Sequence, residues 1–241
     1  MIRLDKYLAD MGVGTRSEVK QYLKKGLVTV DGVTEKRPER KLDECTAQVF
    51  FQGKPVTYAK YEYYMFHKPA GCVTATCDNQ HKTVMDYLKN TKRKDLFPVG
   101  RLDIDTEGLL LVTNDGDLCH ELLSPGKHVP KTYYAKVEGI VTEEDVLRFA
   151  EGVEIGADEK PAVGTLEIQK SDEVSEILLT ITEGRFHQVK RMFEAVDKKV
   201  LYLKRLAMGE LRLDEALEAG EYRALTAAEM EILFPLTERS K

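Results

Sequence analysis

The stretch that decides the fold of this chain, residues 97–116, reads FPVGRLDIDTEGLLLVTNDG. Its apolar run at 108–113 is followed by the turn signal Asn-Asp-Gly at 114–116, so the run is predicted to be a strand. Asp103 lies in the short loop before that strand, two residues after Arg101. A carboxylate held between two apolar segments is placed like a nucleophile and not like a solvated surface charge.

The composition is that of an ordinary soluble protein, with 241 residues, of which 42% are hydrophobic and 32% are charged. This length allows one large domain or two. The sequence contains no run of about 18 apolar residues, so no membrane span is predicted. Residues 1–6 lack the apolar core of a secretion signal, so no secretion is expected. Four cysteines do not form a disulfide framework in a chain of this length, so we expect the reducing cytoplasm as its location.

Charge is distributed unevenly along the chain. Residues 1–60 hold 12 Lys and Arg against 8 Asp and Glu, a net charge of +4, whereas residues 61–241 hold 24 against 33, a net charge of −9. A basic N-terminal module on an acidic body is the asymmetry expected of a nucleic-acid-binding domain. From charge alone, an RNA-binding surface and a merely solvated face remain equally open.

Two short helices are predicted at the N-terminus. Leu4 and Leu8 follow helical spacing on the first. Thr15 and Glu18 fit a capping box that begins the second, and Gly26 is a natural stop for it.

A hairpin and a linker are predicted to follow these helices. Residues 27–33 read as a strand that enters an Asp-Gly turn at 31–32, and a second strand is predicted over 47–51. Residues 53–61, which contain a Gly and a Pro, are predicted to be the linker to the body of the chain.

The body is predicted to be an α+β domain with a mixed, largely antiparallel sheet flanked by helices. Strands are predicted near 62–67, 71–76, 108–113, 131–139, 174–182 and 200–207, and helices near 83–89, 116–123, 142–151, 187–197 and 226–233. The sequence contains no Gly-rich phosphate loop and no dinucleotide-binding fingerprint.

The segment around Asp103 resembles the catalytic-aspartate motif of the pseudouridine synthases. Other segments resemble further motifs of that family in the same order: the Lys-Pro-x-Gly turn in 64–71, Lys-x-Tyr at 131–133, EGRFHQVKRMF at 183–193, and a closing part over 203–209 and 220–226. The EGRFHQVKRMF form is closest to the RsuA type, the small-subunit rRNA enzymes. The large-subunit enzymes usually read N-R-Q-[IV]-R-R at this place.

Residues 1–50 resemble the RNA-binding domain first known in ribosomal protein S-four. The resemblance implies a small α/β RNA-binding domain over 1–58 joined to a pseudouridine synthase domain over 61–236. Double-helical RNA hides its base edges, so such a domain relies on charge and shape. By position, five basic side chains would face phosphate: Arg3, Lys6, Arg16, Lys20 and Lys24.

The family resemblance also implies roles in the body. Asp103 would be the nucleophile, or the electrostatic partner of a developing sugar cation. Lys190 would pair with that carboxylate and keep it ionised in a dry site. Tyr133 would stack under the target base, and its phenol could act as a base. Asp105 has no such match and is predicted to be a turn residue.

Further positions are assigned by the same resemblance. Arg101 would fill the space left by the extruded uridine, Arg185 would bind RNA, and Leu203 would wall the base pocket or belong to the core. Tyr134 should face away from the pocket if its segment is a strand. For Arg191 we expect a solvated charge or a phosphate contact.

The side chains His67, Cys72, Cys77 and His81 could suggest a zinc site. Structural zinc sites usually have tighter Cys pairs, such as C-x2-C, so we do not predict a metal here. The isomerisation of uridine has no redox change, so no metal or cofactor is expected.

The leading interpretation is a cytoplasmic, monomeric enzyme that isomerises uridine in 16S rRNA, with uridine 516 as the expected target and free rRNA or a small-subunit assembly intermediate as substrate. One alternative is the same chemistry on 23S rRNA of the large subunit. The other is a non-catalytic rRNA-binding or ribosome-assembly protein, against which an intact set of Asp103, Tyr133 and Lys190 argues.

Overall fold

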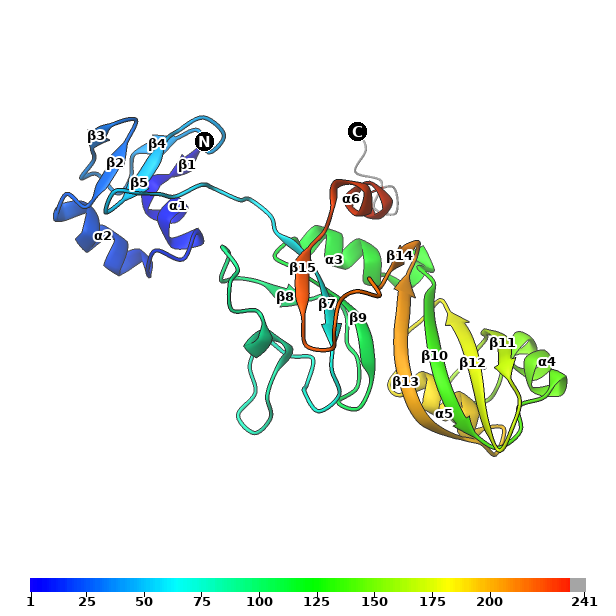
Figure 1. The fold of residues 1–241 in the computed structure, drawn as a ribbon. Coiled ribbons are helices and arrows are strands. Elements are labelled where there is room, and N and C mark those ends of the chain that lie inside the picture. The colour runs from blue at the N-terminus through cyan, green and yellow to red at the C-terminus, as the bar shows by residue number, and fades with distance from the viewer. Residues whose placement is uncertain (235–241) are drawn as a thin grey trace. The chain divides into compact units, whose positions relative to one another are not determined.

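The computed structural model describes residues 1–234 and divides the chain into two compact units (Figure 1). The first unit contains residues 1–62 together with 89–96, and the second contains 63–88 and 97–234. Segment 89–96 therefore belongs to the N-terminal unit although it lies within the sequence of the body. Within residues 1–234, no helix is long and apolar enough to cross a membrane.

The N-terminal unit begins with the two predicted helices, α1 (Leu4–Asp10) and α2 (Arg16–Lys24). The predicted capping box begins α2: the Thr15 hydroxyl accepts from the Glu18 N–H, and the Glu18 carboxylate accepts from the Thr15 N–H at 2.7 Å. Gly26 follows the helix with a φ of +72°, as its predicted stop requires.

Short strands complete this unit. A four-stranded sheet has the order β3-β2-β5-β6, and a separate pair joins β1 to β4. The hairpin between β2 and β3 turns at Asp31 and Gly32, which both have positive φ, as an Asp-Gly turn favours. The strands are β1 (Ile2–Arg3), β2 (Val28–Val30), β3 (Val33–Thr34), β4 (Lys41–Leu42), β5 (Val49–Phe51) and β6 (Lys54–Pro55).

The predicted linker 53–61 begins inside this unit, which corrects its first residues. Gln52 and Gly53 have positive φ and turn the chain back, so that Lys54 and Pro55 pair with β5. Further along, the carbonyl of Val56 accepts from the Tyr7 hydroxyl at 2.7 Å. Tertiary contacts with the helices and the sheet therefore hold the first part of a segment whose composition predicted a free connection.

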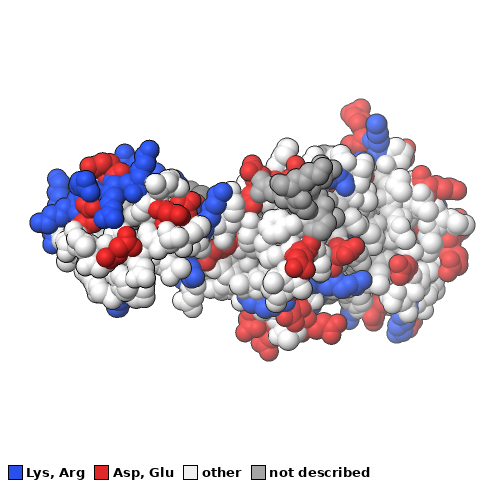
Figure 2. All heavy atoms as spheres, turned by 90° about the horizontal axis from the view of Figure 1, so that it is seen from above, with Lys and Arg blue, Asp and Glu red and all other residues white. Residues whose placement is uncertain are grey.

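The core of the N-terminal unit lies between the two helices and the sheet. It contains these buried side chains: Leu4, Tyr7, Leu8, Val19, Leu23, Val28, Val30, Leu42 and Val49. The charged residues lie outside it, and Lys and Arg gather on the face of this unit that Figure 2 shows. On the second unit the same view shows acidic and basic side chains intermixed.

The second unit is built on a sheet of nine strands, with the main order β11-β12-β10-β13-β9-β7-β15 and with β14 beside β13 and β8 beside β9. The strands are β7 (Tyr63–Lys68), β8 (Phe97–Pro98), β9 (Glu107–Thr113), β10 (Lys131–Glu138), β11 (Thr165–Lys170), β12 (Val174–Ile181), β13 (Lys199–Met208), β14 (Leu211–Arg212) and β15 (Tyr222–Ala224). Among the described pairs only β9–β13 is parallel, so the predicted mixed, largely antiparallel sheet is confirmed.

The β9–β13 junction depends on a glycine. Glu107 and Gly108 pair with Lys204 and Arg205. Gly108 has a φ of +105°, and a Cβ added there would lie 2.2 Å from the carbonyl oxygen of Arg205. Only glycine permits both the backbone angle and this close approach. The junction joins the β7–β9 part of the sheet to the β10–β13 part, directly after the loop that carries Asp103.

Helices cover the sheet: α3 (Gly116–Leu123), α4 (Glu143–Glu151), α5 (Gln188–Glu194) and α6 (Ala227–Leu233), with the 3-10 turns η1 (Val84–Tyr87) and η2 (Pro125–Lys127). Asp115 caps α3 by accepting from the Leu118 N–H at 3.1 Å. Thr142 and Thr226 form capping boxes before α4 and α6. The four predicted helices 116–123, 142–151, 187–197 and 226–233 are thus confirmed. Three of them follow a capping residue, whereas α5 follows His187, which forms no side-chain cap.

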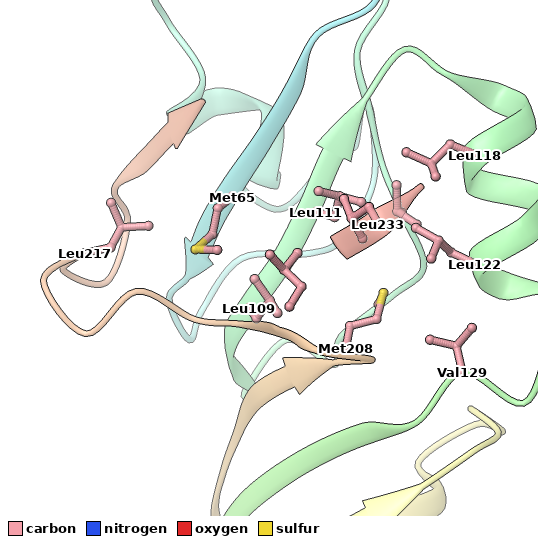
Figure 3. Close-up of a cluster of buried hydrophobic side chains, with 11 residues drawn as sticks. Met65, Leu109, Leu111, Leu118, Leu122, Val129, Met208, Leu217 and Leu233 are labelled. Atoms are coloured by element: carbon pink, nitrogen blue, oxygen red, sulfur yellow. The ribbon is translucent and has the colours of Figure 1, made fainter. Parts of the chain in front are cut away.

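One core of the second unit lies where α3 and α6 pack on β7 and β9 (Figure 3). Leu109 and Leu111 of β9 and Leu118 and Leu122 of α3 face the same interior, together with Met65 of β7 (Figure 3). The apolar run 108–113 is therefore a strand buried along nearly all its length, as its continuous apolar character indicates.

Two predicted elements were wrong. Residues 71–76 form a loop, in which only Val73 makes an isolated bridge, to Thr83. Residues 83–89 form the single 3-10 turn η1 and not a helix. Strands β8, β11, β14 and β15 were not predicted, because short segments with mixed composition carry little periodic signal. The other predicted strands, near 62–67, 108–113, 131–139, 174–182 and 200–207, are confirmed.

Candidate active site

The backbone of the loop that carries Asp103 is held in place by a buried lysine. Lys68 ends β7 and is 0% exposed. Its ammonium donates to the carbonyl oxygens of Asp103 at 2.9 Å and Thr106 at 2.8 Å, and more weakly to Ile104 at 3.4 Å; it also donates to Pro69 at 3.1 Å. Burial lowers the pKa of Lys68. A single cation thus fixes the path of the loop backbone.

The loop at 69–76, of which residues 71–76 were predicted to be a strand, supplies a second support. The Gly71 N–H donates to the carbonyl of Ile104 at 2.7 Å. The Thr74 hydroxyl donates to the Leu102 carbonyl at 2.8 Å and accepts from the Leu102 N–H at 3.1 Å. These bonds replace a strand ladder, and they place both ends of the Asp103 loop.

The carboxylate of Asp103 meets the lysine that the sequence assigned to it. Lys190 of α5 lies with Nζ 3.2 Å from Oδ2 of Asp103, and the Asp103 side chain is 27% exposed. The same ammonium donates to Oδ1 of Asp105 at 2.7 Å. Asp105 is therefore more than the turn residue that the sequence predicted, since it shares Lys190 with Asp103.

The charges in this group support one another. Burial alone would lower the pKa of Lys190, but the carboxylates of Asp105 and Asp103 outweigh it and raise that pKa. Burial alone would raise the pKa of Asp105, but the Lys190 ammonium lowers it. The site therefore holds a cation between two carboxylates.

A third group approaches Asp103 from the start of α5. His187 Nε2 lies 3.6 Å from Oδ1 of Asp103. His187 has a φ of +49°, in the left-handed region that few non-glycine residues occupy. Next to it, Gln188 accepts from the Arg185 N–H at 2.9 Å, which fixes the entry into the helix.

Asp103 lines a cavity together with the other residues of the body to which the sequence assigned roles. Tyr133 of β10 and Leu203 of β13 lie on neighbouring strands, are nearly buried, and line this cavity together with Arg101, Asp103 and Lys190. The structure therefore brings together in one place residues that are up to 102 positions apart in sequence. Apolar walls, one aromatic ring and an ion pair are what a small, mostly enclosed ligand site needs.

Two arginines line this cavity. The Arg101 side chain is exposed. The Arg185 guanidinium is held by both oxygens of Glu183, at 3.0 and 2.9 Å. Arg191 was expected to be solvated or to contact phosphate, but it pairs with Glu159 and donates to the carbonyl of Ile155. It therefore belongs to an internal network.

Tyr134 faces away from the cavity, as strand alternation predicts. Its hydroxyl donates to Glu176 of β12, and burial together with that carboxylate raises the pKa of Tyr134 to about 12. On the adjacent β13, the Tyr202 hydroxyl donates to Glu107 at 2.7 Å.

The four residues of the possible zinc pattern have other surroundings. His67 Nδ1 lies 2.7 Å from the carbonyl of Leu217, and His81 pairs with Asp78 at 3.3 Å. Cys72 is buried and Cys77 is exposed. Among residues 1–234, no three His, Cys, Asp or Glu side chains are grouped to hold a metal ion.

The basic residues assigned to RNA in the N-terminal unit differ in their freedom. Arg3 pairs with Asp5 at 2.8 Å, and Lys6 pairs with Asp10 at 3.0 Å. Arg16, Lys20 and Lys24 lie exposed on α2. Helix α2 is therefore the stronger candidate for phosphate contacts within this unit.

Comparison with known proteins identifies the family. The family described as RNA pseudouridylate synthase matches residues 62–195, and the S4 domain family matches residues 2–46. A Bacillus subtilis (strain 168) protein named "Uncharacterized RNA pseudouridine synthase YtzG" is 47% identical over 234 residues, which are 96% of this chain and 98% of that protein. This chain belongs to the RNA pseudouridylate synthase family.

Further relatives agree with this assignment. The ribosomal small subunit pseudouridine synthase A of Vibrio cholerae is 42% identical and covers 95% of this chain and 98% of its own length. A crystal structure of a pseudouridylate synthase matches with a TM-score of 0.68 at 35% identity, over 97% of this chain and 100% of that one. The synthase is therefore an isomerase of the RsuA type with an S4 domain, and the resemblance read from its sequence is confirmed.

Sequence reasoning missed three residues around Asp103 of this synthase. Lys68 was quoted as part of a turn motif without a role, although a lysine at the end of an apolar strand is itself an unusual signal. Asp105 was set aside because it has no motif match. His187 stands in the same motif as Lys190, three residues before it, so the pairing predicted for Lys190 already brought this segment to Asp103, although no role was assigned to the histidine itself.

Proposed function

We propose that this synthase converts a uridine of 16S rRNA, with uridine 516 as the expected target, to pseudouridine, and that Asp103 is the reacting carboxylate. The observation that carries the proposal is the ion pair of Asp103 with Lys190 at the mouth of a cavity lined by Tyr133 and Leu203. Support for the RNA comes from relatives whose names give the ribosomal small subunit. The proposal places the enzyme in the cytoplasm, as a monomer that acts on free rRNA or on an assembly intermediate.

The reaction exchanges one bond to the sugar for another. The bond from C1′ to N1 of uracil breaks, and its electrons leave with the base. The base turns within the cavity, C5 bonds to C1′, C5 loses its proton, and N1 gains one, so atoms and charge balance. In this proposal Asp103 either bonds to C1′ or stabilises the positive charge that develops at the sugar.

The neighbours of Asp103 take supporting roles in this proposal. Lys190 holds the Asp103 carboxylate in an ion pair at 3.2 Å, so that it stays directed at the cavity. Tyr133 is nearly buried and lines the cavity, so its ring is available to stack on uracil, and in its phenolate form its oxygen could take a proton. Leu203 closes the wall of the cavity and excludes water.

RNA affinity is assigned to two regions. In the N-terminal unit the exposed Arg16, Lys20 and Lys24 on α2 would contact phosphate, and Arg3 and Lys6 would do so beside their acidic partners. At the cavity, Arg101 would occupy the space of the extruded base, and Arg185 would contact the backbone.

The test is isomerisation of 16S rRNA transcripts and of partly assembled small subunits. Tritium release from C5-labelled uridine measures conversion, and carbodiimide mapping locates the product. Asp103→Asn keeps the shape and removes the charge, so conversion should fall at least about 10³-fold while RNA binding persists. Asp158→Asn, an exposed aspartate outside the cavity, is the matched control and should convert normally.

Each alternative predicts a different result. Conversion of 23S rRNA and not of 16S rRNA would replace the small-subunit target with a large-subunit one. Tight rRNA binding without conversion of either RNA would contradict the proposed enzymatic activity and favour a non-catalytic rRNA-binding protein. Normal conversion by Asp103→Asn would remove Asp103 from the mechanism.

A further inference from the structure

A second cavity adjoins the first at Asp103. It shares Arg101, Asp103 and His187 with the first cavity, but it is also lined by Thr74 and Asp78, which the first cavity lacks. Tyr133 and Leu203 do not line it. The proposed function uses the first cavity for the target uridine and leaves the second one without a role.

An exposed aromatic ring lines this second cavity. Phe186 is 74% exposed, which is unusual for so large an apolar side chain, and it lines the second cavity but not the first. Its ring lies parallel to the imidazole of His187, with centroids 3.8 Å apart and 17° between the planes. Because most of the Phe186 ring is exposed, the stacked pair leaves aromatic surface open to solvent.

The charges around the pair suit a nucleotide. Arg101 and Arg185 line the second cavity beside Phe186. Thr74 adds a hydroxyl to the same lining, and Asp78 and Asp103 add carboxylates to it. Proteins that bind single-stranded RNA combine cations for the backbone with aromatic rings on which bases stack. A neighbour of an extruded uridine is itself partly unstacked, so it needs a new stacking partner.

We propose that Phe186, stacked on His187, holds the nucleobase adjacent to the target uridine in the second cavity. This inference rests on the proposed function and adds a second base site to it. Phe186 then acts as a binding residue, and the base it holds replaces the stacking that the uridine gives up. Stacking requires only an aromatic face, so the site accepts different bases.

The test couples a protein change to an RNA change. Splint-ligated 16S rRNA is prepared with its natural sequence, or with an abasic ribose directly 5′ or directly 3′ of the converted uridine. Tritium release at subsaturating RNA is compared for the wild type, Phe186→Ala and Phe186→Trp. Leu147→Ala is the matched control, because Leu147 is an exposed apolar residue on α4, at 63% exposure, and lines neither cavity.

The expected result is a loss that does not add. Removing the base on one side should lower wild-type conversion by about 5-fold to about 100-fold, the range for loss of one stacked base. Phe186→Ala should lose a similar factor on natural RNA and lose little more on that abasic RNA. Phe186→Trp should retain conversion, and Leu147→Ala should behave as the wild type on each RNA.

Other outcomes overturn the inference. Wild-type conversion of natural RNA by Phe186→Ala would overturn it. So would independent losses, in which the abasic ribose lowers conversion by the same factor in Phe186→Ala as in the wild type, because a ring that only shapes its loop would leave the effect of the abasic ribose unchanged. A thermal melt of each variant shows that the exposed substitution leaves the fold intact. If the wild type releases no tritium from natural RNA, the proposed function itself fails and this inference falls with it, whereas an active wild type without coupling removes only the inference.

Discussion

At the scale of single residues, Lys68 fixes the backbone of the site without lining its cavity. Its ammonium donates to carbonyl oxygens along the Asp103 loop, and it is fully buried. A buried cation is costly unless its donors are satisfied. The carbonyls satisfy the lysine, and the lysine in turn fixes the carbonyls, so loop shape and burial depend on each other.

Replacing Lys68 with Met should therefore lower the rate of conversion strongly, while the protein still folds. Met keeps an unbranched apolar stem, but the loop carbonyls lose their donor, and Asp103 would move relative to the cavity. A displacement of about 1 Å can cost about 10²-fold in rate. Tritium release and thermal melts check this, with Lys198→Met, which breaks the pair with Asp145, as the control. Full conversion by Lys68→Met would show that the loop keeps its shape unaided.

At the scale of elements, strand β9 links the Asp103 loop to the sheet. The chain leaves the loop at Glu107 and immediately pairs in parallel with β13, which carries Leu203. The same strand pairs with β7, whose last residue is Lys68. One strand thus aligns the loop, its supporting lysine and one wall of the cavity.

The substitution Gly108→Ala tests this junction. Its Cβ would meet the Arg205 carbonyl oxygen at 2.2 Å in a left-handed backbone conformation, so the β9–β13 pairing has to open. We expect a loss of about 3 kcal/mol or more in the free energy of unfolding, together with lost conversion. Gly116→Ala is the control, because nothing lies within 4 Å of a Cβ there and its φ is not positive. Equal melting temperatures for the two variants would contradict the argument.

At the scale of the whole molecule, charge and chemistry are divided between parts of the chain. The first 60 residues have a net charge of +4, and the rest has −9. The basic residues on α2 are exposed, whereas Arg185 and Lys190 at the cavity are paired with carboxylates. The proposed division assigns much of the RNA affinity to the first part and the bond exchange to the second.

The triple variant Arg16→Ala, Lys20→Ala, Lys24→Ala should weaken binding to 16S rRNA and leave conversion at saturating RNA unchanged. If each side chain meets a phosphate, the slope of log K against log salt should fall by about 2 to 3. Filter binding over a salt series measures this. The control removes Lys136, Lys170 and Lys199, which are exposed on the second unit. The full chain is used because segment 89–96 belongs to the N-terminal unit, so deletion of residues 1–58 would remove only part of that unit and leave 89–96 without its contacts. An unchanged salt slope would exclude α2 as the anchor.

Local signals predicted most elements of the fold. The predicted capping box at Thr15 and the predicted Asp-Gly turn at 31–32 use contacts within a few residues, so sequence spacing reveals them. The capping boxes at Thr142 and Thr226 are equally local, but only the structure identified them. Segment 71–76 looked like a strand, but the hydroxyl of Thr74 bonds to the backbone of Leu102 instead of continuing a ladder. That choice depends on a partner 28 residues away, which periodicity cannot register.

The motif around Asp103, its lysine at 190 and its tyrosine at 133 could be chosen from the chain alone, because each stands in a segment with a recognisable pattern. Tertiary structure alone decided that Asp105 shares Lys190 with Asp103, and that the Lys68 ammonium holds the backbone of the loop. It also decided that His187 and Phe186 line a second cavity. These relations join segments from different strands and a helix. They are set by how the sheet is ordered and by which charges burial forces into contact, and neither is written in any one stretch of sequence.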